Sequence, residues 1–573
     1  MLDVVAGRLQ QLSDGARRLV TLVAVAGDRM PLAVAVGLGD VDAVDELLTA
    51  GFLVDDDGGV AFPHALARRA VVETVTAARR AALHLEVARV MEACGAAAAD
   101  LAHHYYAAAP LGDHEPVVRH GLAAADAALR SLAFEDAVAH AERALPFAPA
   151  SSRARAELLL RLGSALHAAG DLSAARVALQ DAERIALAVD DAALAADAVL
   201  EQAHYGAQFG AAEPEIAAGL RRSLDRIGGG DDARRARLLA RLAIEESAAG
   251  NHDDARALAA EALDLARTLG DDALLLHALA ARHHVLDAPE HLEDRLALAR
   301  ELEDAARRVG DLAFLVRAIG VLAVDAAERG DVEEQDRCLA ELHRLVTLRR
   351  VPHEEWFDLE QQVLRAVIAG DLDAAEAVAE RELTAGRNAS VANALRGYGL
   401  QLLIIRAEQG RSVELVDLAV QLAEQSGAVA ETAMAAYACL AADRIDDAAA
   451  LFGRLDVVAL PRDSILLGAL CVGAELAMHH GDLPLASRVY EQLLPFAGRT
   501  CTIALGTVTV GPIDRYLSYA ARTIGELDRA RDHLLDAIAL DERMGAARWL
   551  ERDRADLERE TTWESSPRRS STG

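Results

Sequence analysis

The sequence has 573 residues, which is long enough for several domains or a repeat array. Of these residues 52% are hydrophobic and 3% aromatic, a composition that is too apolar for disorder beyond the ends of the chain. Its 59 basic residues are all arginine, and the lack of lysine excludes a P-loop lysine and a Schiff-base lysine. The formal net charge of −32 excludes non-specific nucleic-acid binding over the whole surface, because phosphate backbones repel so acidic a body.

Residues 1–92 are predicted to form a small winged-helix-like α+β segment and a linking helix. The expected elements, in order, are a helix capped by Ser13 and ending near Ala26, a short helix from Pro31, a helix over 41–50, a β-hairpin over 52–62, and a long helix from His64 through Met91. Three helices followed by a hairpin is the order of elements in a winged helix.

A turn signal recurs along residues 93–560: a glycine, a polar residue and then a helix that carries alanine. The glycines fall on a lattice of forty residues, at positions 170, 210, 250, 330, 370 and 410, and a Pro-containing turn over 288–290 fills the missing step. A glycine can end one helix in a left-handed conformation, and the polar residue after it can cap the next. This period predicts stacked helix pairs, and hence an all-α, tetratricopeptide-like solenoid of about 10–11 pairs.

Residues 561–573 are rich in Ser, Thr and Arg and are predicted to form a disordered tail. The five cysteines are scattered without a CxxC pair, as expected for buried thiols in a reducing cytoplasm. The N-terminus lacks the design of a signal peptide. The longest uncharged run, over 500–513, has 14 residues, whereas a membrane span needs about 18, so we expect no membrane segment.

Short stretches along nearly the whole chain resemble one known family, the bacterial signal-transduction ATPases with numerous domains (STAND), including the LuxR-type, MalT-like transcriptional activators. The stretches that carry the resemblance are 12–19, 24–27, 47–54, 62–68, 81–84, 101–104, 134–137, 511–517 and 542–546. In that family an ATPase precedes the winged helix, and many members end in a DNA-binding helix-turn-helix. The resemblance therefore implies the winged-helix and tetratricopeptide arm alone, without either of those domains.

The resemblance also singles out His64, because a histidine just after the hairpin touches a nucleotide phosphate in the wider class. An imidazole at the start of a helix suits an anion. Pro63 stands where an arginine is common, and Arg69 where an acid is common. Two interpretations stay open: a phosphate contact made in trans with a partner ATPase, or a capping or packing histidine.

Clustered arginines are the second set of candidates, as contacts for anionic effectors or acidic peptides. They are Arg221, Arg222, Arg234, Arg235, Arg349 and Arg350. The alternative is that they are solvated helix ends that pair with neighbouring acids.

No residue pattern predicts catalysis, a cofactor or a metal site. Histidine pairs occur at 103–104, 283–284 and 479–480, but adjacent rings on a helix point about 100° apart and no HExxH or Cys/His spacing accompanies them. The helix over 41–50 would occupy the recognition-helix position, yet it carries Asp42, Asp45 and Glu46 and no arginine, so we expect no DNA contact.

Two functions are compatible with these patterns. The first is a non-enzymatic sensor arm that binds a protein or small effector on its repeats and couples that event to an ATPase or a transcription factor. The second is a constitutive tetratricopeptide scaffold for protein–protein interaction. The sequence identifies neither the effector nor the partner.

Overall fold

The computed structural model describes residues 7–203, 212–389 and 391–564, and they form an all-α solenoid with two small antiparallel sheets. The chain divides into two compact units, one of residues 1–204 and 219–228, the N-terminal unit, and one of residues 205–218 and 229–573, the C-terminal unit. Helix α13 (Pro214–Arg226) contributes residues to both. The solenoid predicted from the glycine period is confirmed.

The N-terminal segment has the predicted three helices and hairpin in order, with one additional strand and with two helices in place of the predicted last one. It consists of α2 (Asp14–Ala26), β1 (Arg29–Pro31), α3 (Leu32–Leu38), α4 (Val41–Thr49), β2 (Val54–Asp56), β3 (Gly59–Ala61), α5 (Ala65–Glu73) and α6 (Ala77–Ala93). Ser13 caps α2 as expected, because its hydroxyl accepts a hydrogen bond from the Ala16 amide at 3.1 Å. The strands form an antiparallel sheet in the order β1-β3-β2, so β1 joins the hairpin predicted over 52–62.

The long helix predicted from His64 through Met91 is wrong, because the chain breaks between α5 and α6. The Thr74 hydroxyl donates a hydrogen bond to the Val71 carbonyl at 2.7 Å. The Thr76 hydroxyl caps α6 by accepting a hydrogen bond from the Arg79 amide at 3.4 Å. Threonine hydroxyls compete with the helical hydrogen bonds of the backbone, and here two of them end one helix and begin another.

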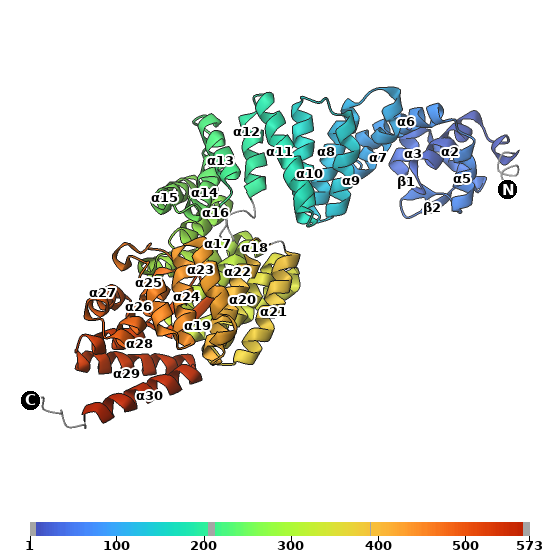
Figure 1. Ribbon diagram of the computed structural model, residues 1–573. Coiled ribbons are helices and arrows are strands. Elements are labelled where there is room, and N and C mark those ends of the chain that lie inside the picture. The colour runs from blue at the N-terminus through green and yellow to red at the C-terminus, as the bar shows by residue number, and fades with distance from the viewer. Residues whose placement is uncertain (1–6, 204–211, 390, 565–573) are drawn as a thin grey trace, which may run out of the picture. The chain divides into compact units, whose positions relative to one another are not determined.

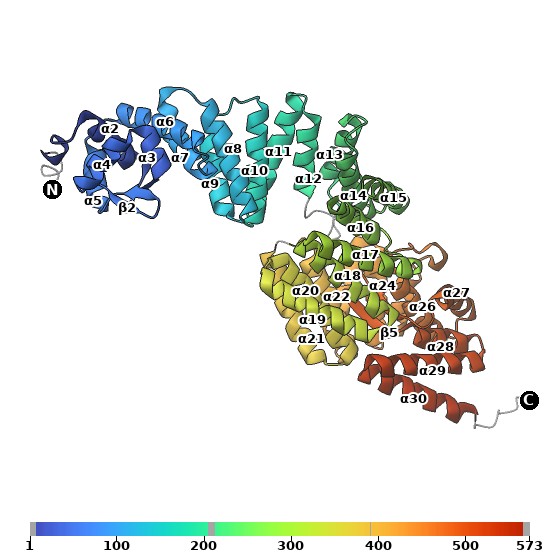
Figure 2. The same ribbon diagram turned by 180° about the vertical axis from the view of Figure 1, so that it is seen from behind.

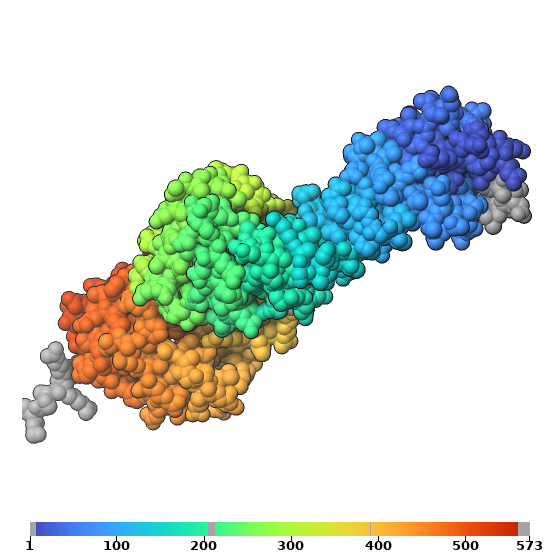
Figure 3. Space-filling model, turned by 90° about the horizontal axis from the view of Figure 1, so that it is seen from above, coloured from blue at the N-terminus to red at the C-terminus, as the bar shows by residue number. Residues whose placement is uncertain are grey.

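Helices then follow in consecutive packed pairs, such as α8–α9 and α10–α11, which stand side by side in Figure 1 and form an unbroken surface in Figure 3. In the N-terminal unit these helices are α7 (Ala98–Ala108), α8 (Glu115–Arg130), α9 (Phe134–Ala144), α10 (Arg153–Ala168), α11 (Leu172–Ala188) and α12 (Ala192–Gln202). Alanines meet at the crossings, where Ala125, Ala141 and Ala182 are fully buried, so the helices approach closely.

The C-terminal unit continues the array. Its helices are α14 (Asp232–Ala248), α15 (His252–Leu269), α16 (Asp272–His284), α17 (Leu292–Val309), α18 (Leu312–Arg329), α19 (Val332–Arg349), α20 (Pro352–Ala369), α21 (Leu372–Asn388), α22 (Ala394–Glu408), α23 (Val416–Ser426), α24 (Val429–Ala441), α25 (Ile445–Phe452), α26 (Leu466–His480), α27 (Leu483–Leu493), α28 (Ile513–Thr523), α29 (Leu527–Met544) and α30 (Ala547–Glu564). No helix in the described part of the chain is long and apolar enough to cross a membrane.

The glycine lattice marks the turns between paired helices. The glycines at 170, 250, 330, 370 and 410 all have positive φ, and Asp171, Asp331 and Asp371 cap the helices that follow them. At the missing step, Pro289–His291 forms a 3-10 turn between α16 and α17. Gly210, and residues 565–573 of the predicted tail, lie outside the described residues.

The uncharged run near residue 500 forms a buried β-hairpin that the sequence patterns do not predict. Strand β4 (Thr500–Ile503) pairs antiparallel with β5 (Val508–Pro512), and every residue of both strands is buried. Its strands contact α18, α20, α22 and α26, which are alternate helices of the array. The hairpin therefore lies against the inner layer of the C-terminal unit, where β5 is visible in Figure 2.

Candidate functional site

The candidate site is the face of the C-terminal unit formed by α18, α20, α22 and α26, which we call the inner face. The β4–β5 hairpin lies at its centre. Small residues allow the close contact: Gly506, at the hairpin turn, has φ +90°, and a Cβ added there would lie 2.6 Å from Val324 Cγ1 on α18. An added Cβ on Gly468 of α26 would lie 2.7 Å from Ile503. The hairpin is thus in close contact with α18 at its turn and with α26 at strand β4.

Polar contacts tie the hairpin to helices far away in the sequence. The Thr507 hydroxyl lies 3.0 Å from Glu360 Oε1 on α20, and the Thr502 hydroxyl lies 3.4 Å from Glu328 Oε2 on α18. Just before β4, Arg499 donates to the Pro289 carbonyl at 2.7 Å. A hairpin held by both packing and specific hydrogen bonds has one defined seat on the inner face.

Two buried carboxyl groups lie beneath the hairpin on α20 and α21. Burial raises the pKa of Glu360 to about 7 and the pKa of Glu382 to about 9, and Glu360 adds to the effect on Glu382. The Gln401 amide donates to Glu382 Oε2 at 2.7 Å, but no arginine pairs with either carboxyl in the described contacts. Glu382 is therefore protonated at neutral pH, which avoids a buried unpaired charge.

A second cluster joins α16, α17 and α18 around a buried arginine. Arg295 donates to Asp325 at 2.7 Å and also bonds Glu328, while His283 Nε2 lies 2.8 Å from Asp325. Arg295 further donates to the Leu286 carbonyl at 3.2 Å. Burial raises the pKa of Glu328, whereas His283 and Arg295 outweigh the effect of burial on Asp325 and lower its pKa. One guanidinium thus organises two carboxylates beside the hairpin.

A third cluster anchors the end of the hairpin to α28 and α30. Arg515 donates to Asp553 at 2.5 Å and to the Val510 carbonyl at 3.3 Å, and Tyr516 donates to the same carbonyl at 3.1 Å. Burial raises the pKa of Asp541, the other carboxyl near Arg515, to about 8. The stretch 511–517, part of the family resemblance, therefore holds β5 in place.

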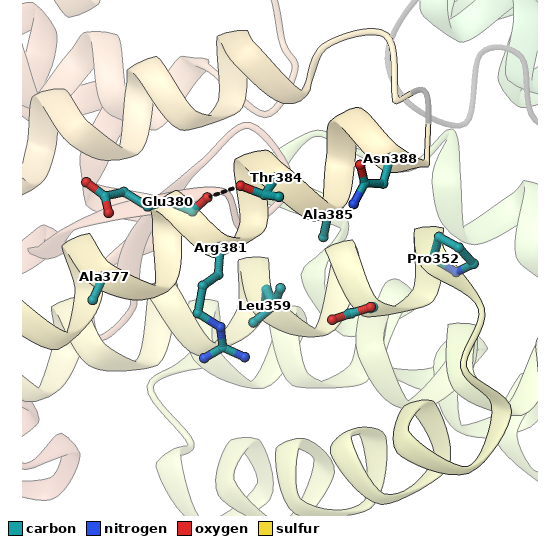
Figure 4. A pocket seen from close by; sticks show the side chains of 9 residues that line it. Pro352, Leu359, Ala377, Glu380, Arg381, Thr384, Ala385 and Asn388 are labelled. Carbon is teal, nitrogen blue, oxygen red and sulfur yellow. Dashed lines mark hydrogen bonds between the residues drawn. The ribbon is translucent and has the colours of Figure 1, made fainter.

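A groove of about 490 Å³ lies between α20 and α21 (Figure 4). Its lining residues come from both helices and are Pro352, Glu355, Leu359, Ala377, Glu380, Arg381, Thr384, Ala385 and Asn388. In Figure 4, Arg381 extends from α21 toward α20, beside Leu359, whereas Glu380 points away from it. The groove carries both charges, with Glu355 and Glu380 on one side of the balance and Arg381 on the other.

His64 occupies the N-cap position of α5, with its side chain exposed and making no capping hydrogen bond. Its exposure leaves the predicted contact in trans sterically open.

The acidic helix α4 contributes to the cap of α2. Glu46 on α4 accepts a hydrogen bond from the Ser13 amide at 2.8 Å and pairs with the Ser13 hydroxyl. The acidic α4 thus uses its charge within the fold.

The predicted arginines are dispersed over the array, and most pair with acids. Arg222 bonds Glu183 at 2.9 Å, Arg234 bonds Asp231 at 2.6 Å, Arg235 bonds Glu261 at 2.7 Å, and Arg349 bonds Glu354 at 2.8 Å. Arg221 is exposed on α13, and Arg350 is the exposed C-cap of α19 with φ +54°. The six arginines therefore come from three elements, α13, α14 and the end of α19.

A histidine cluster that the sequence patterns miss lies on α6 and α7. His84 Nδ1 and His104 Nδ1 are 2.9 Å apart and both rings are buried, and the exposed His103 completes a group of three. Burial lowers the pKa of His84 to about 4 and that of His104 to about 3. The adjacent pair 103–104 is visible in the sequence, but the third ring comes from another helix.

No protein-family model and no curated protein matches this chain. Solved structures similar to it include a STAND protein with a tetratricopeptide repeat sensor from Pyrococcus horikoshii, with 13% identity and TM-score 0.35, covering 62% of this chain and 60% of that one. A Rap protein complexed with Competence and Sporulation Factor has 10% identity and TM-score 0.35, covering 71% and 98%. The Cut9–Hcn1 hetero-tetramer of APC/C has 13% identity and TM-score 0.42, covering 83% and 93%.

Proposed function

We propose that this chain is a non-enzymatic regulatory arm of the STAND type that acts in the cytoplasm. Its helical repeats bind a protein or a small effector, and the winged-helix-like segment couples that event to an ATPase or transcription partner. The seated hairpin is the observation that carries this proposal, because an element that can be held or released is what an effector needs in order to act. The resembling stretch 511–517, which includes Arg515, supports the same assignment.

The proposal requires a second state of the C-terminal unit, in which the hairpin leaves its seat. The hairpin packs in the core of the C-terminal unit and is also held by two hydrogen bonds to side chains of the array, Thr507 to Glu360 and Thr502 to Glu328. An effector that binds the inner face only when the hairpin is displaced would shift the equilibrium by its difference in affinity for the two states. Such a ligand would replace the threonine hydroxyls as partners of the two carboxyl groups.

Affinity capture with the full chain tests the coupling. We expect a P-loop ATPase or a transcription factor to be enriched from a lysate of the source organism, and Gly506→Ala, which disturbs the hairpin seat, to change its recovery. Gly525→Ala is the matched control, since Gly525 has φ +87° and an added Cβ there meets nothing within 4 Å. Equal recovery with both variants would favour a constitutive scaffold, and failure to recover either class of partner would contradict the coupling.

His64 provides a second test of the coupling. His64→Ala should leave the free energy of unfolding within about 1 kcal/mol, because the ring is exposed and forms no cap. It should weaken the nucleotide dependence of the captured ATPase, whereas His480→Ala, an exposed histidine at the end of α26, should not. Calorimetry of the full chain alone with ATP should show no binding, since the proposed phosphate contact needs the partner's nucleotide site.

A further inference from the structure

The three histidines on α6 and α7 bring their ring nitrogens together at one point. One nitrogen from each of His84, His103 and His104 lies within 4.8 Å of the other two. The ring centroids are 5.1 Å apart for His84 and His104, 5.1 Å for His103 and His104, and 5.8 Å for His84 and His103. Three imidazoles converging from two helices have the donor set and the spacing of a transition-metal site.

The closest pair of ring nitrogens belongs to His84 and His104. Two Nδ1 atoms 2.9 Å apart can share only one proton, so one ring donates and the lone pair of the other accepts. If the shared proton moves to Nε2 of its own ring, both Nδ1 lone pairs become free for a metal without any net release of a proton.

A second group of possible ligands, Asp514, His533 and Asp536, shows what a satisfied cluster looks like. His533 Nδ1 bonds Asp514 Oδ1 at 2.8 Å, and His533 Nε2 bonds the Tyr490 hydroxyl at 3.1 Å. The other Asp514 oxygen accepts from the Gly498 amide at 2.5 Å. Here both ring nitrogens bond protein partners, whereas in the α6–α7 cluster the facing Nδ1 atoms bond each other and no further partner among the described residues.

We propose that His84, His103 and His104 form a site for a divalent transition-metal ion of the zinc type. Each histidine supplies one nitrogen, and the exposed edge beside His103 leaves a coordination position for water or for a ligand from a partner. Such a site ties α6, the last helix of the N-terminal segment, to α7, the first helix that follows it. It is independent of the proposed effector surface on the C-terminal unit.

Zinc titration of the metal-free full chain tests the site. Isothermal calorimetry should show one saturable Zn²⁺ ion per chain, and His103→Ala should weaken its affinity by about 100-fold or more, since even residues that only support a ligand cost 10- to 100-fold. His103 is exposed, so this variant keeps the fold. Binding by the wild type that is no tighter than by His103→Ala would overturn the proposal and leave an ordinary hydrogen-bonded histidine pair.

Two controls identify the ligands. The double variant His479→Ala/His480→Ala removes an exposed histidine pair, and Cys94→Ser removes the exposed thiol that follows α6, so both should bind Zn²⁺ as the wild type does. Loss of binding in either would place the ion elsewhere and contradict the assignment. In the wild type, Co²⁺ should give visible absorption of a low-symmetry nitrogen site that disappears in His104→Gln, and an unchanged spectrum would likewise reject the site.

Discussion

The two units bury polar side chains in different ways. In the described part of the N-terminal unit, residues 7–203 and 219–228, these are His84, His104, His120 and Ser223. The C-terminal unit buries arginines and carboxyl groups instead, including Arg295, Glu328, Glu382, Arg515 and Asp541. The N-terminal repeats are held by the shape of small apolar residues, whereas the C-terminal repeats also depend on which charges face each other. The two units should therefore respond to different kinds of substitution.

The largest effect is expected from the charge cluster of the C-terminal unit. Arg515→Ala should lower the free energy of unfolding by about 3–5 kcal/mol, because it leaves Asp553 buried without its cation. Chemical denaturation followed by circular dichroism measures this loss. Arg554→Ala, which breaks an exposed pair with Glu542, is the control and should cost less than about 1 kcal/mol. Equal effects of the two would show that the buried cluster does not stabilise the unit.

In the N-terminal unit, an increase in volume should have a large effect. An added Cβ on Gly163 of α10 would lie 2.4 Å from Leu179 Cγ on α11, so Gly163→Val should cost about 2–3 kcal/mol through overpacking. Ala168→Val, at the exposed end of the same helix, gives the reference for valine propensity alone. Thermal unfolding of both variants measures the difference, and similar melting temperatures would mean that this helix crossing yields without cost.

The pH dependence of stability should also separate the units. The pKa of Glu382 is about 9 in the folded chain and near 4.5 when unfolded, so between these values the folded state binds more protons and its stability falls as the pH rises. Glu382→Gln should remove about 2.7 kcal/mol of this loss between pH 6 and pH 8, the effect of one proton over two pH units. Denaturant titrations at several pH values test it, with the exposed Glu380→Gln as control; parallel curves for wild type and Glu382→Gln would disprove the buried protonated acid.

The smallest effect is expected at a surface ion pair. Arg235→Ala breaks the bond to Glu261, in which both side chains are more than 40% exposed, and should change stability by less than about 1 kcal/mol. Because Arg235 was predicted as an anion contact, the same variant should leave partner capture unchanged if the arginine serves only its own helix pair. A reduced recovery of the partner would restore it to the binding surface.

Local signals in the sequence could predict much of the fold. Ser13 and the glycines of the lattice act within a few residues of themselves, so their caps and turns can be recognised from neighbouring residues. The hairpin could not be predicted in this way, because Thr507 meets Glu360 at a separation of 147 residues. The helix break at 74–76 depends on threonine hydroxyls that fit equally well inside a helix. His84 joins His103 and His104 only after α6 and α7 pack.

The contacts between the hairpin and distant helices should change how the C-terminal unit unfolds. In an ordinary solenoid each repeat contacts only its nearest neighbours, so the array can unfold from one end, repeat by repeat. Here Arg499, at the foot of β4, reaches Pro289 at a separation of 210 residues. Loss of one end should therefore loosen the middle, and we expect these repeats to unfold in a single cooperative step, whereas the alanine-packed repeats of the N-terminal unit should unfold one after another.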